Sequence, residues 1–316
     1  MRGVFLDAGS LVQSAMDMTP LERESLRWEH YEATLSDALH ERIAAADIVI
    51  TNKVMLDERS LAEAGQLKLI CIAATGTNNV DLEAAKRLGI TVCNVRGYTT
   101  PSVVEHVFTL LLALMRHLPE YHRAVQSGRW QRSVHFSFID FPIQELAGKM
   151  LGIVGYGELG RSVARVAEAF GMRVMIAERV GMAPRAGRMP LAELLRIVDV
   201  LTLHCPLTAV TSGLIGAREL QSMKRGAVLI NTARGGIVDE VALLEALRSR
   251  HLGGAGVDVL SQEPPVDNPL LSADIPNLIV TPHIAWASRE SRQRLVNEIA
   301  ANIDAFIKGE PRNVVA

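Results

Sequence analysis

The chain has 316 residues, a formal net charge of −2 and 48% hydrophobic residues. A chain of this length is too long for a domain with one ordinary hydrophobic core, so we predict two domains of roughly 150 residues each. Near-neutral charge without a basic block excludes an electrostatic nucleic-acid binder, and the hydrophobic share excludes a disordered chain. The most apolar run, 107–115, has about half of the roughly 20 residues that a membrane span requires, so no membrane role is predicted.

The N-terminus and the cysteines indicate a cytoplasmic protein. Residues 1–7 lack the long apolar stretch of a signal peptide and are expected to form a first strand. Cys71, Cys93 and Cys205 lie in apolar segments without paired spacing. Such thiols are typical of a reducing compartment and predict neither a disulfide nor a cysteine metal site.

Short apolar runs alternate with helical patterns along the chain, which is typical of parallel sheets covered by helices on both faces. In the first hundred residues we expect strands at 4–7, 47–51, 67–73 and 91–95. Thr100 and Pro101 are typical of an N-cap and a first helical position. The helix that follows is apolar on nearly all sides, so it should be buried, and it should end before Pro119.

An irregular segment, about 119–146, separates the two halves of the chain. It is rich in Arg and His and contains Trp130, Phe136, Phe138 and Phe141 among polar residues. Two interpretations stay open. The segment is either an exposed arm that packs on another subunit or a loop folded back on its own domain.

A second alternating set begins at Met150, with strands expected at 151–154, 173–177, 200–204, 227–231, 255–260 and 278–281. The second set offers no remaining surface for an amphipathic helix at 288–307, so we expect this helix to pack against the first domain. We therefore expect an α/β protein with two doubly wound, Rossmann-like or flavodoxin-like parallel-sheet domains. Residues 1–99 with 286–316 would form the substrate domain, and residues 100–285 an inserted NAD-binding domain.

A glycine-rich loop predicts dinucleotide binding. Gly155, Gly157 and Gly160 lie between an apolar strand and a helix, a spacing that lets the backbone approach a pyrophosphate at the helix N-terminus. Glu178 ends the next strand, where an acid is expected to accept the ribose hydroxyls, and it favours NAD because it would repel a 2′-phosphate. The nearby residues Arg179, Arg185 and Arg188 leave NADP possible.

Arg234, Glu263 and His283 follow three later strands, whose carboxyl ends are the usual ligand edge of such sheets. A guanidinium can hold a substrate carboxylate, an imidazolium can donate a proton to a carbonyl, and a carboxylate can orient the imidazole. Alone, each residue would be an ordinary surface or capping group; together they predict a dehydrogenase of a hydroxy acid. The other histidines show no metal-ligand spacing, so no metal is predicted.

Several segments carry a resemblance to a known family. Through NTARGGIVDE, GVDVLSQEPP and VTPHIAWAS the chain resembles the D-isomer-specific 2-hydroxyacid dehydrogenases over essentially its whole length. Through AATGTNNVDL, GYTTPSVVEH and LAGKMLGIVGYGELG it is most similar to the glycerate dehydrogenase, or hydroxypyruvate reductase, members of that family.

The resemblance implies a role for each matching residue. Arg234 would bind the substrate carboxylate and polarise the carbonyl, His283 would be the acid and base, and Glu263 would hydrogen-bond His283. Asp258 would accept from the nicotinamide carboxamide. The matched substrate positions are the backbone N–H groups of Thr75, Gly76 and Thr77 together with Tyr98, and the matched cofactor positions are Glu158, Leu159, Glu178, Cys205, Thr232, Ala233, Arg234, Asp258 and His283.

These observations predict an NAD-dependent reductase of hydroxypyruvate and glyoxylate that runs in reverse as a D-glycerate dehydrogenase. Its partners would be small 2-keto and 2-hydroxy acids and a second copy of the chain in a homodimer. One alternative is a related enzyme of the phosphoglycerate or D-lactate type. Another is an NAD-sensing, corepressor-like binding protein that keeps the fold without significant turnover.

Overall fold

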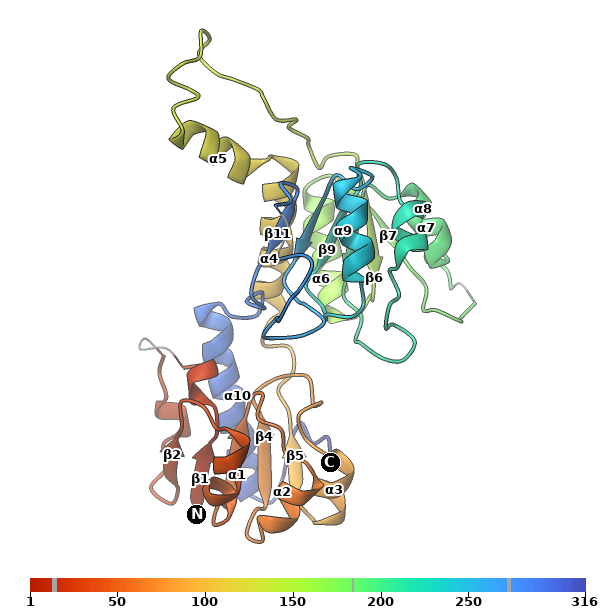
Figure 1. Cartoon of the computed structure of the whole chain (residues 1–316). Helices are drawn as coiled ribbons and strands as arrows, with labels where there is room; N and C mark the ends of the chain where they lie inside the picture. Colours follow the sequence, from red (N-terminus) through yellow and green to blue (C-terminus); the bar gives the residue numbers. More distant parts are fainter. Residues whose placement is uncertain (13–15, 184, 272–273) are drawn as a thin grey trace. The chain divides into compact units, whose positions relative to one another are not determined.

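The computed structural model describes residues 1–12, 16–183, 185–271 and 274–316. The chain divides into two compact units, Met1–Thr99 with Trp286–Ala316 and Thr100–Ala285 (Figure 1). Each unit contains one sheet, and all neighbouring strands in both sheets run parallel within the described residues. The predicted fold class, two parallel α/β sheets, is confirmed.

The first unit has a five-stranded sheet in the order β2-β1-β3-β4-β5. Its elements are β1 (Arg2–Phe5), β2 (Arg27–His30), α1 (Ser36–Ile43), β3 (Ile48–Thr51), α2 (Glu58–Glu63), β4 (Leu69–Ile72), α3 (Leu82–Arg87), β5 (Thr91–Cys93) and α10 (Arg289–Ile307), with short 3₁₀ turns at Ala8–Ser10 and Thr19–Leu21. The edge strand β2 was not predicted, because its sequence RWEH is largely exposed and has no apolar run. Helix α10 packs Leu295, Ile299 and Ile303 into the core of this unit.

The second unit has a six-stranded sheet in the order β11-β10-β9-β8-β6-β7. Its strands are β6 (Met150–Val154), β7 (Arg173–Ile176), β8 (Val200–Leu203), β9 (Val228–Asn231), β10 (Gly254–Val257) and β11 (Leu278–Val280), and its helices are α4 (Thr100–Met115), α5 (Leu118–Gln126), α6 (Glu158–Ala169), α7 (Leu191–Ile197), α8 (Ala217–Ser222) and α9 (Glu240–Arg248). One apolar cluster joins α4 and α6 to the sheet, and another joins α7, α8 and α9 to it. The strand order reverses between β6 and β8, which is where open α/β sheets bind ligands.

The segment between the sheets differs in part from the prediction. Helix α4 ends at Met115, before Pro119 as expected, but Pro119 then opens helix α5 within the segment predicted to be irregular. A proline suits the first turn of a helix, where its missing N–H has no partner to lose. His117, with φ +48°, forms the turn between the two helices.

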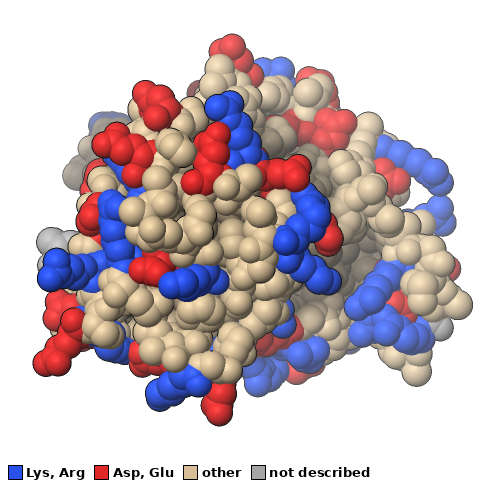
Figure 2. Space-filling view, turned by 90° about the horizontal axis from the view of Figure 1, so that it is seen from below, with Lys and Arg blue, Asp and Glu red and all other residues tan. Residues whose placement is uncertain are grey.

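On the face drawn in Figure 2, acidic and basic side chains are interspersed, without a broad basic area. Among the described residues, no helix is both long and apolar enough to cross a membrane.

Candidate active site

The sheet of the second unit brings the predicted cofactor and catalytic residues of that unit to one edge. Each follows the carboxyl end of a strand: Gly155 follows β6, Glu178 β7, Cys205 β8, Thr232 β9, Asp258 β10 and His283 β11. Because all six strands are parallel, these ends lie on the same side of the sheet. The arrangement gathers residues from positions more than a hundred apart in the sequence.

The three glycines of the loop before α6 have three different physical requirements. Gly155 has φ +96°, and a β-carbon there would collide with the backbone of His204. A β-carbon at Gly160 would meet the carbonyl oxygen of Gly155, so this glycine allows helix and strand to pack closely. At Gly157 nothing lies within 4 Å of the missing β-carbon, which leaves open space beside the backbone. These properties fit the pyrophosphate loop of a dinucleotide site.

Other residues at this edge also fit a bound dinucleotide. The Thr232 hydroxyl is buried and has no hydrogen-bond partner among the described residues. A buried hydroxyl without a partner is costly, so its position favours a polar ligand group. The Cys205 thiol is partly buried, and burial raises its pKa, so it contributes a neutral contact surface. The Oε1 atom of Glu158, at the start of α6, accepts a hydrogen bond from the Thr100 hydroxyl at 2.8 Å.

Glu263 and His283 form a direct hydrogen-bonded pair. His283 Nδ1 lies 2.6 Å from Glu263 Oε2, and Glu263 Oε1 accepts from the backbone N–H of Leu260 at 2.9 Å. The side chains are 29% and 36% exposed, so a substrate can reach them. Because the carboxylate only accepts, Nδ1 carries the proton of this bond, and Nε2 is the nitrogen that can exchange a proton with a substrate.

The loop that carries Glu263 is anchored from α9. Glu240 accepts from the Ser261 N–H at 2.6 Å, from the Ser261 hydroxyl at 2.9 Å and from Asn268 Nδ2 at 2.7 Å. These bonds join both ends of the segment 261–268 to one carboxylate. Glu240 was not singled out from the sequence, because a glutamate in the first turn of a helix is ordinary on its own.

The turn that carries Arg234 packs against the same loop. Asn231 shapes it, with Nδ2 donating to Arg234 O at 3.0 Å and Oδ1 accepting from the Ala233 N–H at 3.1 Å. A β-carbon at Gly235 would collide with the backbone of Leu260, so the two segments are in close contact. The exposed Arg234 therefore lies on a turn next to the Glu263 loop, and its Nη1 donates to Ala233 O at 2.7 Å.

A buried network, missed by the sequence analysis, holds the turn of His283. Asp258 Oδ1 accepts from the Thr281 hydroxyl at 2.5 Å and the Ile284 N–H at 2.9 Å, and Oδ2 accepts from the Ala285 N–H at 2.9 Å. His106 Nε2 lies 3.0 Å from Thr281 Oγ1. Since the Thr281 hydroxyl donates its proton to Asp258, His106 must be the donor to Thr281.

This network matters because His283 adopts φ +54°, a left-handed conformation that is uncommon for a residue with a side chain. Burial raises the pKa of Asp258, but the hydrogen bonds from His106, Thr281 and the two backbone N–H groups outweigh it, so the pKa lies below its usual value. Asp258 thus stays ionised and holds the Thr281 side chain before His283 and the backbone of Ile284 and Ala285 after it. No short motif could indicate this, because the three side chains come from α4 and from the ends of two strands.

The predicted substrate residues of the first unit lie beyond the carboxyl ends of β4 and β5. Within the described part of the chain, the backbone N–H groups of Thr75, Gly76 and Thr77 have no hydrogen-bond acceptor. Thr75 is held by its hydroxyl, which donates to Val95 O at 2.8 Å, and by its carbonyl, which accepts from Asn94 Nδ2 at 2.8 Å. Successive N–H groups of this kind can bind an anion.

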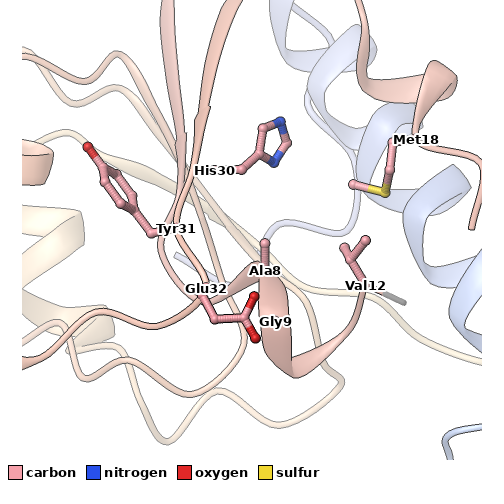
Figure 3. A pocket seen from close by; sticks show the side chains of 7 residues that line it. All are labelled: Ala8, Gly9, Val12, Met18, His30, Tyr31 and Glu32. Carbon is pink, nitrogen blue, oxygen red and sulfur yellow. The ribbon is translucent and has the colours of Figure 1, made fainter. Parts of the chain in front are cut away.

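Two surface hollows lie in the first unit. One, of about 450 Å³, includes Tyr98, whose carbonyl accepts from Ser291 Oγ at 3.2 Å and Arg294 Nε at 3.0 Å. The other, of about 290 Å³, contains none of the predicted substrate residues (Figure 3). Its lining residues are Ala8, Gly9, Val12, Met18, His30, Tyr31 and Glu32.

Comparison with known proteins decides the family. Residues 108–285 match the family model described as D-isomer specific 2-hydroxyacid dehydrogenase, NAD binding domain. The chain belongs to this family. It is 48% identical to a glycerate dehydrogenase from Methylorubrum extorquens, over 99% of this chain and 98% of that protein.

Solved structures agree with this result. The TT0316 protein from Thermus thermophilus superposes with a TM-score of 0.89 at 37% identity, over the whole of both chains. An acyclic imino acid reductase, Bsp5, solved with NADPH and D-Arg, superposes with a TM-score of 0.87 at 28% identity, again over both whole chains. The protein is therefore an oxidoreductase with an NAD-binding domain, and the prediction of dinucleotide binding is confirmed.

Proposed function

We propose that this enzyme reduces hydroxypyruvate to D-glycerate, also reduces glyoxylate, and catalyses the reverse oxidation. The observation that carries the proposal is the hydrogen bond of 2.6 Å between His283 and Glu263, beside the turn of Arg234. These residues supply an acid, its orienting carboxylate and a cation, the set that reduction of a 2-keto acid requires. The identity of 48% with a glycerate dehydrogenase supports the choice of substrate.

Each of the three side chains has one task in this proposal. Arg234 binds the substrate carboxylate with paired, charge-assisted hydrogen bonds and draws electron density from the adjacent carbonyl. His283 donates the Nε2 proton to the carbonyl oxygen during reduction and removes it from the hydroxyl during oxidation. Glu263 holds the ring through Nδ1 and stabilises the imidazolium. When bound, the nicotinamide supplies or accepts the hydride.

The first unit supplies the remaining substrate contacts in this proposal. The N–H groups of Thr75, Gly76 and Thr77 bind a substrate carboxylate in this proposal, because they lack acceptors within the described chain. Tyr98 lines the substrate side-chain pocket. Residues 1–99 with 286–316 thus act as the substrate domain.

The proposal is tested by steady-state assays of NADH oxidation with hydroxypyruvate, glyoxylate, pyruvate and 3-phosphohydroxypyruvate. We expect the highest kcat/KM with hydroxypyruvate. A higher value with pyruvate or 3-phosphohydroxypyruvate would reject the substrate, and no turnover with any of the four would support the binding-protein alternative.

The pH profiles test the role of His283 separately. Reduction needs the protonated ring and oxidation needs the neutral ring, so the reduction rate should fall and the oxidation rate should rise as the pH increases. Profiles of the same shape in both directions would contradict an acid–base role for His283.

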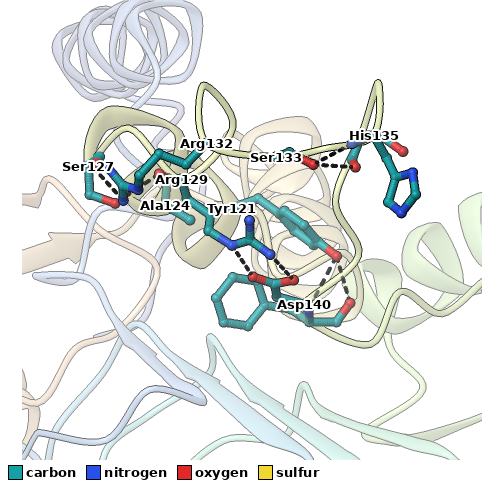
Figure 4. Close-up of polar contacts among 10 residues, drawn as sticks. Tyr121, Ala124, Ser127, Arg129, Arg132, Ser133, His135 and Asp140 are labelled. Atoms are coloured by element: carbon teal, nitrogen blue, oxygen red, sulfur yellow. Dashed lines mark hydrogen bonds and ion pairs between the residues drawn. The ribbon is translucent and has the colours of Figure 1, made fainter.

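We propose further that the segment of about 119–146, called the arm from here on, packs against a second copy of the chain. The arm is ordered by its own polar contacts, among them Arg129 with Asp140 at 2.8 Å and Tyr121 Oη with Phe141 O at 2.7 Å (Figure 4). Yet Val134 and Phe136 are each 92% exposed and Ile139 is 82% exposed. Large apolar side chains displayed on an ordered segment are typical of an interface.

Sedimentation velocity tests this assembly. The double substitution Phe136→Ser with Ile139→Ser should convert a dimer to a monomer, whereas Val241→Ser, which removes an apolar side chain 62% exposed on α9, should not. A monomeric wild-type protein, or a double variant that remains dimeric, would reject the assignment.

The cysteines support our proposal of a cytoplasmic location. All three are free thiols. Cys71 and Cys93 are buried, and burial raises the pKa of Cys93 to about 11, so neither thiol is poised for oxidation. Free, unreactive thiols are typical of a reducing compartment.

A further inference from the structure

Glu240, the first residue of α9, uses both of its carboxylate oxygens to hold the loop 261–268. Its Oε1 accepts from the Ser261 N–H at 2.6 Å, and its Oε2 accepts from the Ser261 hydroxyl at 2.9 Å and from Asn268 Nδ2 at 2.7 Å. Asn268 is only 7% exposed, and its Oδ1 accepts from the Leu270 N–H at 3.0 Å, so this amide cannot turn away without losing a second bond. One side chain thus holds the loop at both ends.

Two consecutive backbone N–H groups connect Glu240 to the catalytic pair of Glu263 and His283. The Ser261 N–H donates to Glu240, and the N–H of the preceding residue, Leu260, donates to Glu263 Oε1 at 2.9 Å. A fixed peptide group between these two residues limits the rotation of Leu260, whose N–H directs one oxygen of Glu263. The other oxygen, Oε2, lies 2.6 Å from His283 Nδ1. Glu240 therefore acts on the imidazole through the loop.

The same peptide group touches the turn that carries Arg234. A β-carbon at Gly235 would collide with the carbonyl of Leu260 and with the backbone nitrogen of Ser261. Helix α9 follows this turn directly in the chain, so Glu240 joins the end of the Arg234 turn to the start of the loop that carries Glu263. Its hydrogen bonds keep the segments of the cation and of the orienting carboxylate in one arrangement.

We propose that Glu240 is a positioning residue for the catalytic pair, because it holds the loop in the arrangement in which Glu263 bonds to His283. The proposal rests on the proposed dehydrogenase function for the task of His283. Since Glu240 acts through the loop, its loss should lower kcat and leave the Kd of NADH unchanged. A merely structural anchor would instead lower the melting temperature and leave the kcat of the folded enzyme unchanged.

Reversing the polarity of one hydrogen bond tests the proposal. In Glu240→Gln the new amide faces the amide of Asn268, and any rotation of the two groups leaves one N–H without an acceptor. We expect kcat for the reduction of hydroxypyruvate to fall about tenfold, with the KM for NADH within about twofold of the wild-type value. Asn268→Asp alone should be impaired to a similar degree, because it sets two carboxylates against each other.

The double variant, Glu240→Gln with Asn268→Asp, restores an acceptor opposite the new amide and also restores the net charge. It should recover most of kcat. Glu245→Gln is the matched control, because it removes a 70% exposed carboxylate from the same helix, and its kcat should stay within about twofold of the wild-type value. Wild-type kcat in Glu240→Gln, or a loss that the double variant does not recover, would overturn the proposal and leave the dehydrogenase function intact.

A proton resonance gives a second readout that needs no turnover. The Nδ1 proton of an imidazole in a short hydrogen bond to a carboxylate resonates downfield of ordinary N–H signals, and its loss in Glu263→Gln assigns it to His283. We expect the resonance to be lost in Glu240→Gln and to return in the double variant. This order without reduction of any keto acid would support the positioning role and reject the proposed function. A resonance unchanged in Glu240→Gln would overturn the positioning role.

Discussion

The two halves of the ligand edge in the second unit are built in different ways. The half formed by β6, β7 and β8 relies on backbone geometry, through Gly155, Gly157 and Gly160, and its acid, Glu178, is buried and saturated with donors. The half formed by β9, β10 and β11 relies on side chains carried by loops. Its acid, Glu263, is 36% exposed, accepts from the Leu260 N–H and pairs with the His283 imidazole.

The difference shows what each half can do. A saturated carboxylate is a fixed structural charge, whereas a partly exposed carboxylate on an imidazole can respond to a change of protonation in its partner. The two glutamates follow different strands of one sheet, Glu178 after β7 and Glu263 after β10, and therefore have separate functions. The half formed by β6, β7 and β8, called the cofactor half, should govern cofactor binding. The half formed by β9, β10 and β11, called the catalytic half, should govern turnover.

The largest effect should come from Glu263→Gln. The amide keeps the size of the side chain but removes the charge that stabilises the imidazolium, so kcat for reduction of hydroxypyruvate should fall about 10³-fold. Glu178→Gln, at the other acid, should act mainly on the KM for NADH. Steady-state kinetics of both variants compare the two halves directly, and a larger loss of kcat in Glu178→Gln would reverse the assignment.

Arg234→Gln should have the next largest effect. Loss of a charge-assisted contact of about 3 kcal/mol predicts a fall of about 10²-fold in kcat/KM for hydroxypyruvate. The Kd of NADH, measured by quenching of protein fluorescence, should change little, because the side chain serves the substrate. Loss of NADH binding with an unchanged KM for the keto acid would show that Arg234 binds the cofactor and not the substrate.

Substitutions of two glycines test the backbone requirements of the cofactor half. At Gly157 a methyl group meets open space in the protein, so Gly157→Ala should leave the melting temperature nearly unchanged. The same methyl group should obstruct a pyrophosphate and weaken NADH binding about 30-fold, since overpacking of this kind costs about 2 kcal/mol. Gly155→Ala should instead lower the melting temperature, because of φ +96° and the collision with His204. Equal effects of the two substitutions on stability would contradict this division.

The same difference explains which features of the site could be predicted from the sequence and which could not. The glycine loop and its strand and helix could be predicted because backbone requirements recur at fixed spacing. The pairing of Glu263 with His283 was predicted from the need of an acid–base imidazole for an orienting carboxylate, and also through the resemblance to a family. The engagement of Glu178 by Arg185 and the contacts of His106 with Thr281 could not be predicted, because side-chain partners depend on how loops pack. The strand β2 was missed because an exposed edge strand needs no apolar run.

The smallest effect expected is that of the hydroxyl that links His106 to Asp258. Thr281→Val keeps the shape of the side chain but removes the donor to a buried carboxylate, and one such bond is worth about 1.5 kcal/mol. Because the Asp258 carboxylate holds the backbone that follows His283, kcat should fall about tenfold while the KM for NADH stays within about twofold. Thr281→Ser, which restores the hydroxyl, should recover most of the loss. If the Val variant keeps wild-type activity and the Ser variant is impaired, the methyl group and not the hydrogen bond positions His283, and the catalytic half would then depend on packing in the same way as the cofactor half.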